Sequence, residues 1–187
     1  MIELAKEEIL KKNATGFYVD LGCSEERAET KKFEDAGWKG IHVDARINYA
    51  VYSYDGYVDF YDLGSVHPDL KFYSGVKENL YMSKAQAVFP NIDIFASPYM
   101  KTKRVECKKL ETILDENNIN EITFLKIDLE GSEHEVLSVF PFDKYKIDYI
   151  FIEGDACNEL LVSNGFNLIG NEKANALYKY TQVNDNG

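Results

Sequence analysis

The segment that most constrains this chain is residues 125–137, LKIDLEGSEHEVL, in which a short apolar run breaks into acidic residues and a glycine. Leu125 and Ile127 alternate as in a buried strand, and Asp128 and Glu130 follow two residues apart. If the chain stays extended past Ile127, both carboxylates leave the strand on one side. The segment therefore predicts a strand that ends in a paired acidic site. The alternative is that both acids are solvated turn residues.

A helix is expected directly after this acidic corner. Ser132 and Glu135 have the spacing of a capping box, which starts a helix. Val136, Leu137 and Phe140 recur at the helical spacing that buries one face. The pattern therefore predicts a strand, an acidic corner and a helix in immediate succession.

Size and charge exclude some classes of partner. The chain has 187 residues, enough for one domain with a full core, and we expect a single domain over residues 1–187. It contains 32 acidic and 21 basic residues, and its formal net charge is −11. This negative charge argues against electrostatic binding to nucleic acid or to an anionic membrane, so neither is expected as a partner. The oligomeric state is left open.

Cysteine usage and the N-terminus bear on the compartment. Cys23, Cys107 and Cys157 are odd in number, far apart and without CxxC spacing, which predicts neither a disulfide framework nor a zinc site. Residues 1–12 are charged and amphipathic, and no apolar run approaches the length of a membrane span. We expect a soluble, cytoplasmic protein.

The first strand leads into a candidate cofactor loop. Residues 17–21 form a short apolar strand, which turns through Gly22, Cys23 and Ser24 into a helical stretch. A strand, a glycine turn and a helix N-terminus are the usual place for a nucleotide-like cofactor. Only Gly22 of the dinucleotide fingerprint is present, and two glutamates at the start of the helix would repel a pyrophosphate. NAD and FAD are therefore disfavoured, and a nicotinamide-dependent oxidoreductase stays a minor alternative.

A cationic cofactor suits this loop better. S-adenosylmethionine carries a sulfonium, an ammonium and ribose hydroxyls, and acids at the ends of the first two strands suit those groups. Asp20 is one candidate, at the end of the first strand. Asp44 closes the second strand a little over twenty residues past the glycine turn, where an acid commonly accepts ribose hydroxyls. The alternative for Asp44 is a surface acid at a strand end.

The chain after Asp44 is unusually short. Only Ala45 and Arg46 precede the next predicted strand, residues 47–52, whereas a parallel crossover needs about a dozen residues or more. The helix between strands two and three is therefore expected to be missing, and residues 47–52 either run antiparallel or continue across a corner. Residues 54–56, YDG, predict a hairpin turn into a strand at 58–61.

The rest of the chain alternates between irregular and regular segments. Residues 62–104 are irregular and aromatic, which predicts a lid over the substrate or, alternatively, a mobile insertion. Strands are expected at 104–107, 122–127 and 147–152, and the last of these is almost continuously apolar and ends in Glu153. An antiparallel pair at 166–169 and 176–180 closes the chain. These elements predict an open α/β sheet, mostly parallel, with a C-terminal antiparallel hairpin.

With these elements placed, the chain resembles the FkbM-type family of S-adenosylmethionine-dependent methyltransferases. The resemblance is carried by residues 17–45, 48–61 and 108–137 and by the strand DYIFIEGD at 148–155. Together these segments cover more than half of the chain in the right order, and LKIDLEGSEHEVL is the most specific of them.

The resemblance implies a class I methyltransferase-like (Rossmann-like) fold, with a seven-strand sheet and the cofactor over the C-terminal ends of the first strands. Asp20 and Gly22 match the family's cofactor loop, and Asp44 matches the acid that holds the ribose. Asp128, Glu130 and Glu133 match the acidic motif beside the transferred methyl group.

The implied activity is S-adenosylmethionine-dependent O-methylation of a hydroxyl on a sugar, a glycan or a small natural product. Asp128 is the candidate base, and Glu130 lies close enough in the chain to raise its pKa. Alternatively, Asp128, Glu130 and Glu153 gather a divalent cation such as magnesium, which would acidify a bound hydroxyl. An alternative from another class is a catalytically silent module that keeps the fold and binds a glycan or a protein partner.

Overall fold

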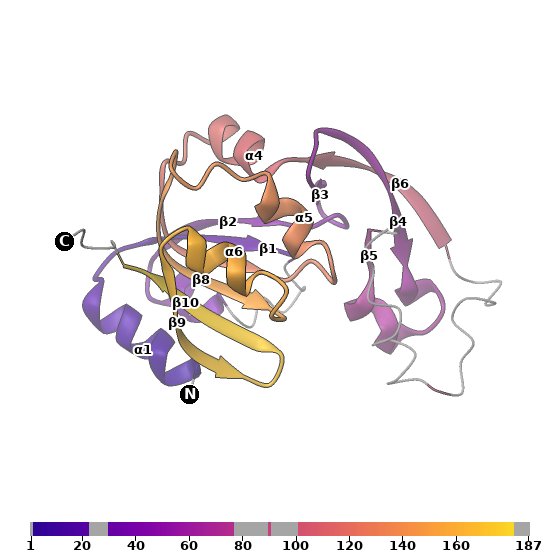
Figure 1. Cartoon of the computed structure of the whole chain (residues 1–187). Helices are drawn as coiled ribbons and strands as arrows, with labels where there is room; N and C mark the ends of the chain where they lie inside the picture. The colour runs from indigo at the N-terminus through magenta and orange to yellow at the C-terminus, as the bar shows by residue number, and fades with distance from the viewer. Residues whose placement is uncertain (1, 23–29, 77–89, 91–100, 182–187) are drawn as a thin grey trace.

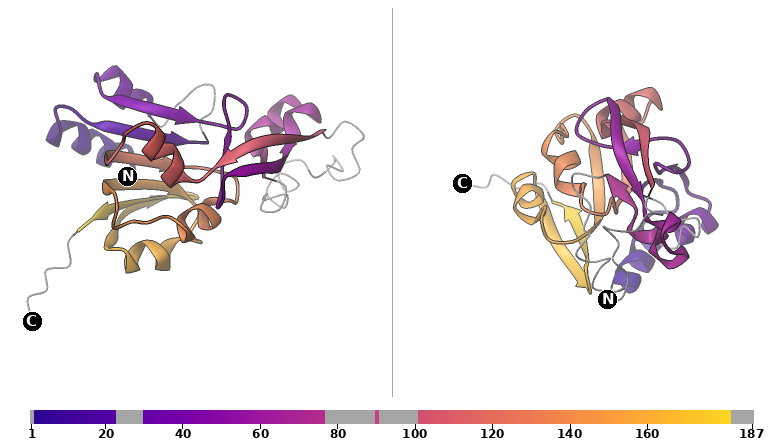
Figure 2. Two further views of the ribbon diagram at one scale, coloured as in Figure 1. Left: turned by 90° about the horizontal axis from the view of Figure 1, so that it is seen from above. Right: turned by 90° about the vertical axis from the view of Figure 1, so that its right-hand side faces the viewer.

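The computed structural model describes residues 2–22, 30–76, 90 and 101–181. These residues form a mixed α/β molecule with two sheets (Figure 1). The main sheet has six strands in the order β2-β1-β7-β8-β10-β9, and the second sheet has four in the order β3-β6-β4-β5. The parallel strands of the main sheet point their carboxyl ends toward the second sheet (Figure 2).

The main sheet confirms the expected mostly parallel arrangement with an antiparallel hairpin at its end. Its first four strands in the order above pair in parallel, and β10 then pairs antiparallel with both β8 and β9. The strands are β1 (Phe17–Leu21), β2 (Lys39–Val43), β7 (Glu121–Ile127), β8 (Lys146–Glu153), β9 (Phe166–Glu172) and β10 (Asn175–Tyr180).

Helices cover both faces of the main sheet because successive residues of its strands point to opposite sides. Tyr18 and Phe124 pack in the cluster that contains α1 and α2, whereas their neighbours Val19 and Leu125 pack in the cluster that contains α4, α5 and α6. The helices are α1 (Ile2–Lys12), α2 (Lys31–Asp35), α4 (Leu110–Glu116), α5 (Glu133–Ser138) and α6 (Asn158–Ser163). Within the described ranges, no helix has the length and apolar character that crossing a membrane requires.

The second sheet corrects the predicted hairpin. It consists of β3 (Ala50–Val51), β4 (Gly56–Asp62), β5 (Gly75–Val76) and β6 (Lys101–Lys108). The strands β3 and β4 do not pair with each other, because β6 lies between them: Cys107 is opposite both Ala50 and Gly56. The β4–β6 ladder is the longer one, since β4 pairs with β6 along its whole length, whereas β3 has only two residues and pairs with the other edge of β6.

The missing helix between β2 and β3 is confirmed, because residues 44–49 form only a tight turn. The Asn48 side chain holds this turn by accepting hydrogen bonds from the backbone of Asp44 and Tyr49. The predicted strand at 47–52 therefore shrinks to two residues, and these join the second sheet in parallel with β6. Among the residues that the structure describes, the main sheet has six strands, whereas the family resemblance implied seven.

Part of the segment predicted as a lid is regular. Two 3-10 helices, Leu63–Ser65 and Pro68–Tyr73, precede β5, and they bury Leu63 and Leu70 completely. Residues 101–104 belong to β6. Residues 77–89 and 91–100 lie outside the described residues, so a lid stays a prediction.

Candidate functional site

A row of polar side chains crosses the main sheet near the carboxyl ends of its parallel strands. Asp20 on β1 is in register with His42 on β2 and with Lys126 on β7. Because side chains alternate along a strand, Asp20 and Lys126 lie on the same face as Tyr18 and Phe124, under α1 and α2. Asp20 and Lys126 are each only 1% exposed, so these charges lie inside the protein.

Lys126 connects the turn after β1 to the acid after β7. Its Nζ atom donates hydrogen bonds to the carbonyl oxygens of Gly22 (2.9 Å) and Leu21 (3.4 Å). The same ammonium lies 3.3 Å from Oδ1 of Asp20 and 3.5 Å from Oδ2 of Asp128. A buried ammonium is tolerated only with such partners, so Lys126 fixes the positions of both carboxylates.

Asp20 is held as a carboxylate beneath the site. Burial alone would raise the pKa of Asp20, but hydrogen bonding from His42, the charge of Lys126 and the bond from Thr30 together lower it below its usual value. Thr30 Oγ1 donates to Asp20 Oδ2 at 2.7 Å. The structure therefore places Asp20 in the charge network below the cavity, and it is not among the residues that line the cavity.

A cavity of about 300 Å³ opens between the two sheets, at the lower end of the size range of ligand pockets. It brings together residues from the turn after β1, the end of β2 and the acidic corner after β7, and its far wall comes from the second sheet. The lining includes Gly22, Asp44, Arg46, Lys71, Lys126, Asp128, Glu130 and Ser132, with Ala50, Val51, Phe60 and Val76 on the second sheet.

The backbone conformation and the close packing at position 22 both require glycine. Its φ of +73° is in the left-handed region, and a Cβ atom there would stand 1.7 Å from the carbonyl oxygen of Asp128. Its backbone N–H donates to Val43, and the N–H of Asp128 donates to Leu21. The turn after β1 is thus packed directly on the acidic corner. Cys23 and Ser24, the other residues predicted in this loop, lie outside the described residues.

Asp44 lines the cavity, but its carboxylate is shared with Arg46. Oδ1 accepts from the backbone N–H and the Nε atom of Arg46, both at 2.8 Å, and Oδ2 accepts from Nη2 at 3.0 Å. Each carboxylate oxygen has a second lone pair, so further hydrogen bonds remain available. Asp44 is 8% exposed.

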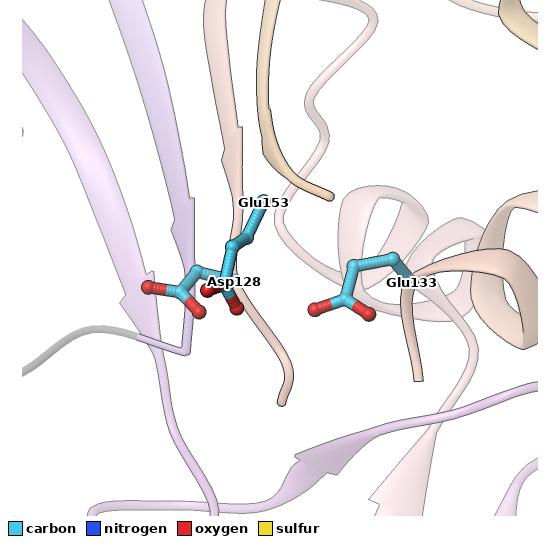
Figure 3. A group of neighbouring side chains, drawn as sticks. All are labelled: Asp128, Glu133 and Glu153. Atoms are coloured by element: carbon cyan, nitrogen blue, oxygen red, sulfur yellow. The ribbon is translucent and has the colours of Figure 1, made fainter. Parts of the chain in front are cut away.

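The acidic corner differs from the expected extended chain. Glu130 has a φ of +53°, so the backbone turns there and does not carry Asp128 and Glu130 to one side. The carboxylates that meet are those of Asp128, Glu133 and Glu153, with one oxygen of each within 4.8 Å of the others. Figure 3 shows Glu133 reaching from the start of α5 toward the other two. Glu133 thus takes the place predicted for Glu130, which lines the cavity instead.

Glu133 also closes the loop in front of α5. Its two oxygens accept the backbone N–H groups of Leu129 (2.7 Å) and Gly131 (3.0 Å). The predicted helix start is confirmed, because Ser132 is the N-cap residue of α5, but the capping box itself is wrong, because Ser132 makes no side-chain cap bond. Burial raises the pKa of Glu133, whose side chain is almost completely enclosed.

The two carboxylate oxygens of Asp128 lie in different surroundings. Oδ2 faces Lys126, whereas Oδ1 is buried and accepts no hydrogen bond within the described part of the chain. Burial chiefly raises the pKa of Asp128, Lys126 opposes the shift, and the charge of Glu153 adds to it. The Ser132 hydroxyl, in a residue only 1% exposed, likewise has no hydrogen-bond partner in the described ranges.

Two members of this site are not among the residues predicted from the sequence. Lys126 lies within an apolar strand pattern, and a lysine flanked there by Leu125 and Ile127 is the signal of a buried, paired charge. His42 lies in the middle of another short strand and gave no comparable signal; its ring contacts Asp20 and the hydroxyl of Tyr18.

Comparison with known proteins assigns this fold and site to a family. The family model described as the methyltransferase FkbM domain matches residues 16–159, most of the chain. The protein therefore belongs to the FkbM methyltransferase family, as the sequence pattern predicted, and at the level of the family it is a methyltransferase. Comparisons with the curated proteins and with the solved structures found no match.

Proposed function

We propose that the protein is an S-adenosylmethionine-dependent O-methyltransferase of class I, Rossmann-like architecture, with the cofactor in the cavity between the sheets. The observation that carries the proposal is the meeting of Gly22, Asp44 and Asp128 around one cavity, at the carboxyl ends of three adjacent parallel strands. In open α/β sheets, ligands bind outside the carboxyl ends of the strands. The family assignment independently supports methyl transfer.

The cavity suits a cationic ligand with hydroxyl groups. Asp44 stands at the end of β2, where it accepts ribose hydroxyls through its remaining lone pairs. Asp128 and Glu130 add further negative charge to the lining of the cavity. When bound, S-adenosylmethionine supplies an electrophilic methyl group on its sulfonium.

Asp128 is the residue placed to handle the proton of an acceptor hydroxyl. Its pKa is raised, chiefly by burial, and a carboxylate with a raised pKa is a better general base near neutral pH. Lys126 holds Oδ2, which leaves Oδ1 to face the hydroxyl. Much of the rate would come from this fixed orientation.

The acceptor is proposed to be a hydroxyl of a sugar, a glycan or a small natural product. The second sheet provides an apolar wall for it through Val51, Phe60 and Val76. The net charge of −11 does not favour a nucleic acid as the acceptor.

The direct test is isothermal titration of the folded protein with S-adenosylmethionine, followed by assay of Asp128→Asn against a panel of hydroxyl acceptors. We expect wild-type protein to bind the cofactor and Asp128→Asn to keep that binding while losing about 100-fold or more in methyl transfer. The exposed Asp143→Asn is the matched control and should behave as wild type. Absence of cofactor binding at millimolar concentration would remove the proposal.

A catalytically silent binding module is the second candidate, and the Asp44–Arg46 contact favours it. Because Arg46 engages both carboxylate oxygens, the acid that should hold the ribose is partly occupied. Arg46→Ala distinguishes the two candidates. Tighter cofactor binding in this variant with methyl transfer in the wild type supports the enzyme, whereas no cofactor binding by either protein supports the module.

A further inference from the structure

We propose that Asp128, Glu133 and Glu153 form a binding site for a hard divalent cation of the Mg²⁺ or Ca²⁺ type. One oxygen from each carboxylate lies within 4.8 Å of the others, and the three side chains come from three separate elements (Figure 3). Asp128 follows β7, Glu133 begins α5 and Glu153 ends β8. The fold therefore brings these three carboxylates together.

The spacing matches the size of such an ion. Oxygens on opposite sides of Ca²⁺ are up to about 5 Å apart, and those around Mg²⁺ up to about 4.2 Å. Three oxygens within 4.8 Å of one another are compatible with Ca²⁺ as they stand and with Mg²⁺ after a small closure.

Two buried oxygens without a hydrogen-bond partner in the described ranges, one on Asp128 and one on the residue before Glu133, point independently to a ligand. Asp128 Oδ1 is buried and accepts no hydrogen bond from the described residues. The hydroxyl of Ser132, which directly precedes Glu133 and lines the same cavity as Asp128, also has no partner there. Buried oxygen atoms are normally satisfied, so these two are suited to an ion or to a water molecule in its coordination shell.

Glu133 is oriented in advance for this role. The backbone N–H groups of Leu129 and Gly131 each take one lone pair of its carboxylate and fix its direction. A carboxylate has about four acceptor positions, so two remain for a cation. Such support of a ligand by fixed hydrogen bonds is typical of metal sites.

The excess of negative charge around Asp128 also favours a bound cation. Lys126 is shared between Asp20 and Asp128, and Asp20 is further stabilised by Thr30. Glu133 and Glu153 then add negative charge beside Asp128. A divalent ion would offset the repulsion among the three carboxylates.

In the proposed reaction, the bound cation would hold the acceptor hydroxyl. This role of the cation rests on the proposed function. A cation bound at Asp128 Oδ1 would replace the role of that oxygen as a base, because the cation would itself orient the acceptor hydroxyl and lower the pKa of that hydroxyl. The metal site itself does not depend on methyl transfer and is tested without the cofactor.

The experiment is isothermal titration of metal-stripped protein with CaCl₂ and, separately, with MgCl₂. We expect one saturable site with a dissociation constant between about 10 µM and 1 mM for at least one ion. Bound ion should also raise the thermal unfolding midpoint, because it binds only the folded protein. No heat and no shift in midpoint up to about ten times that range would overturn the proposal.

Glu153→Gln and Asp128→Asn should each weaken binding by at least about tenfold. Glu135→Gln, an exposed acid on the same helix as Glu133, is the matched control and should bind as wild type. Unchanged affinity in Glu153→Gln would overturn the ligand set. Circular dichroism verifies that each variant is folded.

Titration of S-adenosylmethionine in the presence of EDTA separates the two proposals. Cofactor binding without any ion binding would refute the metal site and keep the proposed function. Ion binding without cofactor binding would keep the metal site and refute the proposed function.

Discussion

A single buried lysine determines how the acids around it are arranged. Lys126 lies between Asp20 and Asp128 and also bonds the Gly22 carbonyl, so one ammonium serves the strand β1, its turn and the acidic corner. Removing one partner of a buried ion pair leaves an uncompensated charge, which costs far more than the pair itself contributes.

Lys126→Met keeps the length of the side chain and removes its charge. We expect the free energy of unfolding to fall by about 3 kcal/mol, measured by urea denaturation at pH 7. Asp20→Asn provides the second arm of a double-mutant cycle. The double variant should be more stable than the sum of the single losses predicts, by about 1 kcal/mol or more. Simple additivity would show that the two charges do not interact.

At the scale of elements, local pattern predicted most of the main sheet. The apolar segments that became β1, β7 and β8 were identifiable because strands buried on both faces have nearly continuous apolar sequences. The missing helix after β2 was predictable by counting residues. The position of β6 between β3 and β4 was not, since it depends on pairing between segments about fifty residues apart, which no local pattern records.

The candidate site, like the main sheet, was predictable only where local pattern determines it. Asp128 and Glu153 were found because both lie at the ends of recognisable strands. The choice between Glu130 and Glu133 depended on one backbone angle, the φ of +53° at Glu130, which turns the chain and brings in the acid at the start of α5. A glutamate gives no sequence signal for that conformation, because non-glycine residues rarely adopt it.

The contact between the turn after β1 and the corner after β7 is the tightest junction of two elements at the site. Gly22→Ala would place a Cβ atom 1.7 Å from the Asp128 carbonyl oxygen and impose a positive φ on alanine. We expect a loss of about 2 kcal/mol or more in unfolding free energy and weaker cofactor binding, since the two elements must separate. Gly170→Ala is the control, because a Cβ there meets nothing within 4 Å. Equal stability of the two variants would contradict the packing.

At the scale of the whole molecule, the two sheets have cores of very different size. The second sheet's core comprises Ala50, Tyr52, Val58, Val76 and Cys107, while the main core draws on α4, α5 and α6 and on every strand of the main sheet. Only Val51 of β3 reaches into the main core. Regions with little buried apolar surface open at lower free energy than the rest of a protein.

Two buried cysteines report separately on these cores. Cys107 lies in the second sheet and Cys157 in the main core, where burial raises its pKa to about 12. Neither thiol should react in the native protein, because a buried thiol is neither accessible nor ionised. In a Cys23→Ser background, pulse labelling along a urea titration, read by mass spectrometry, should modify Cys107 at a lower urea concentration than Cys157. Coincident midpoints would mean instead that both sheets unfold in one step, so that the cavity between them opens only when the whole domain does.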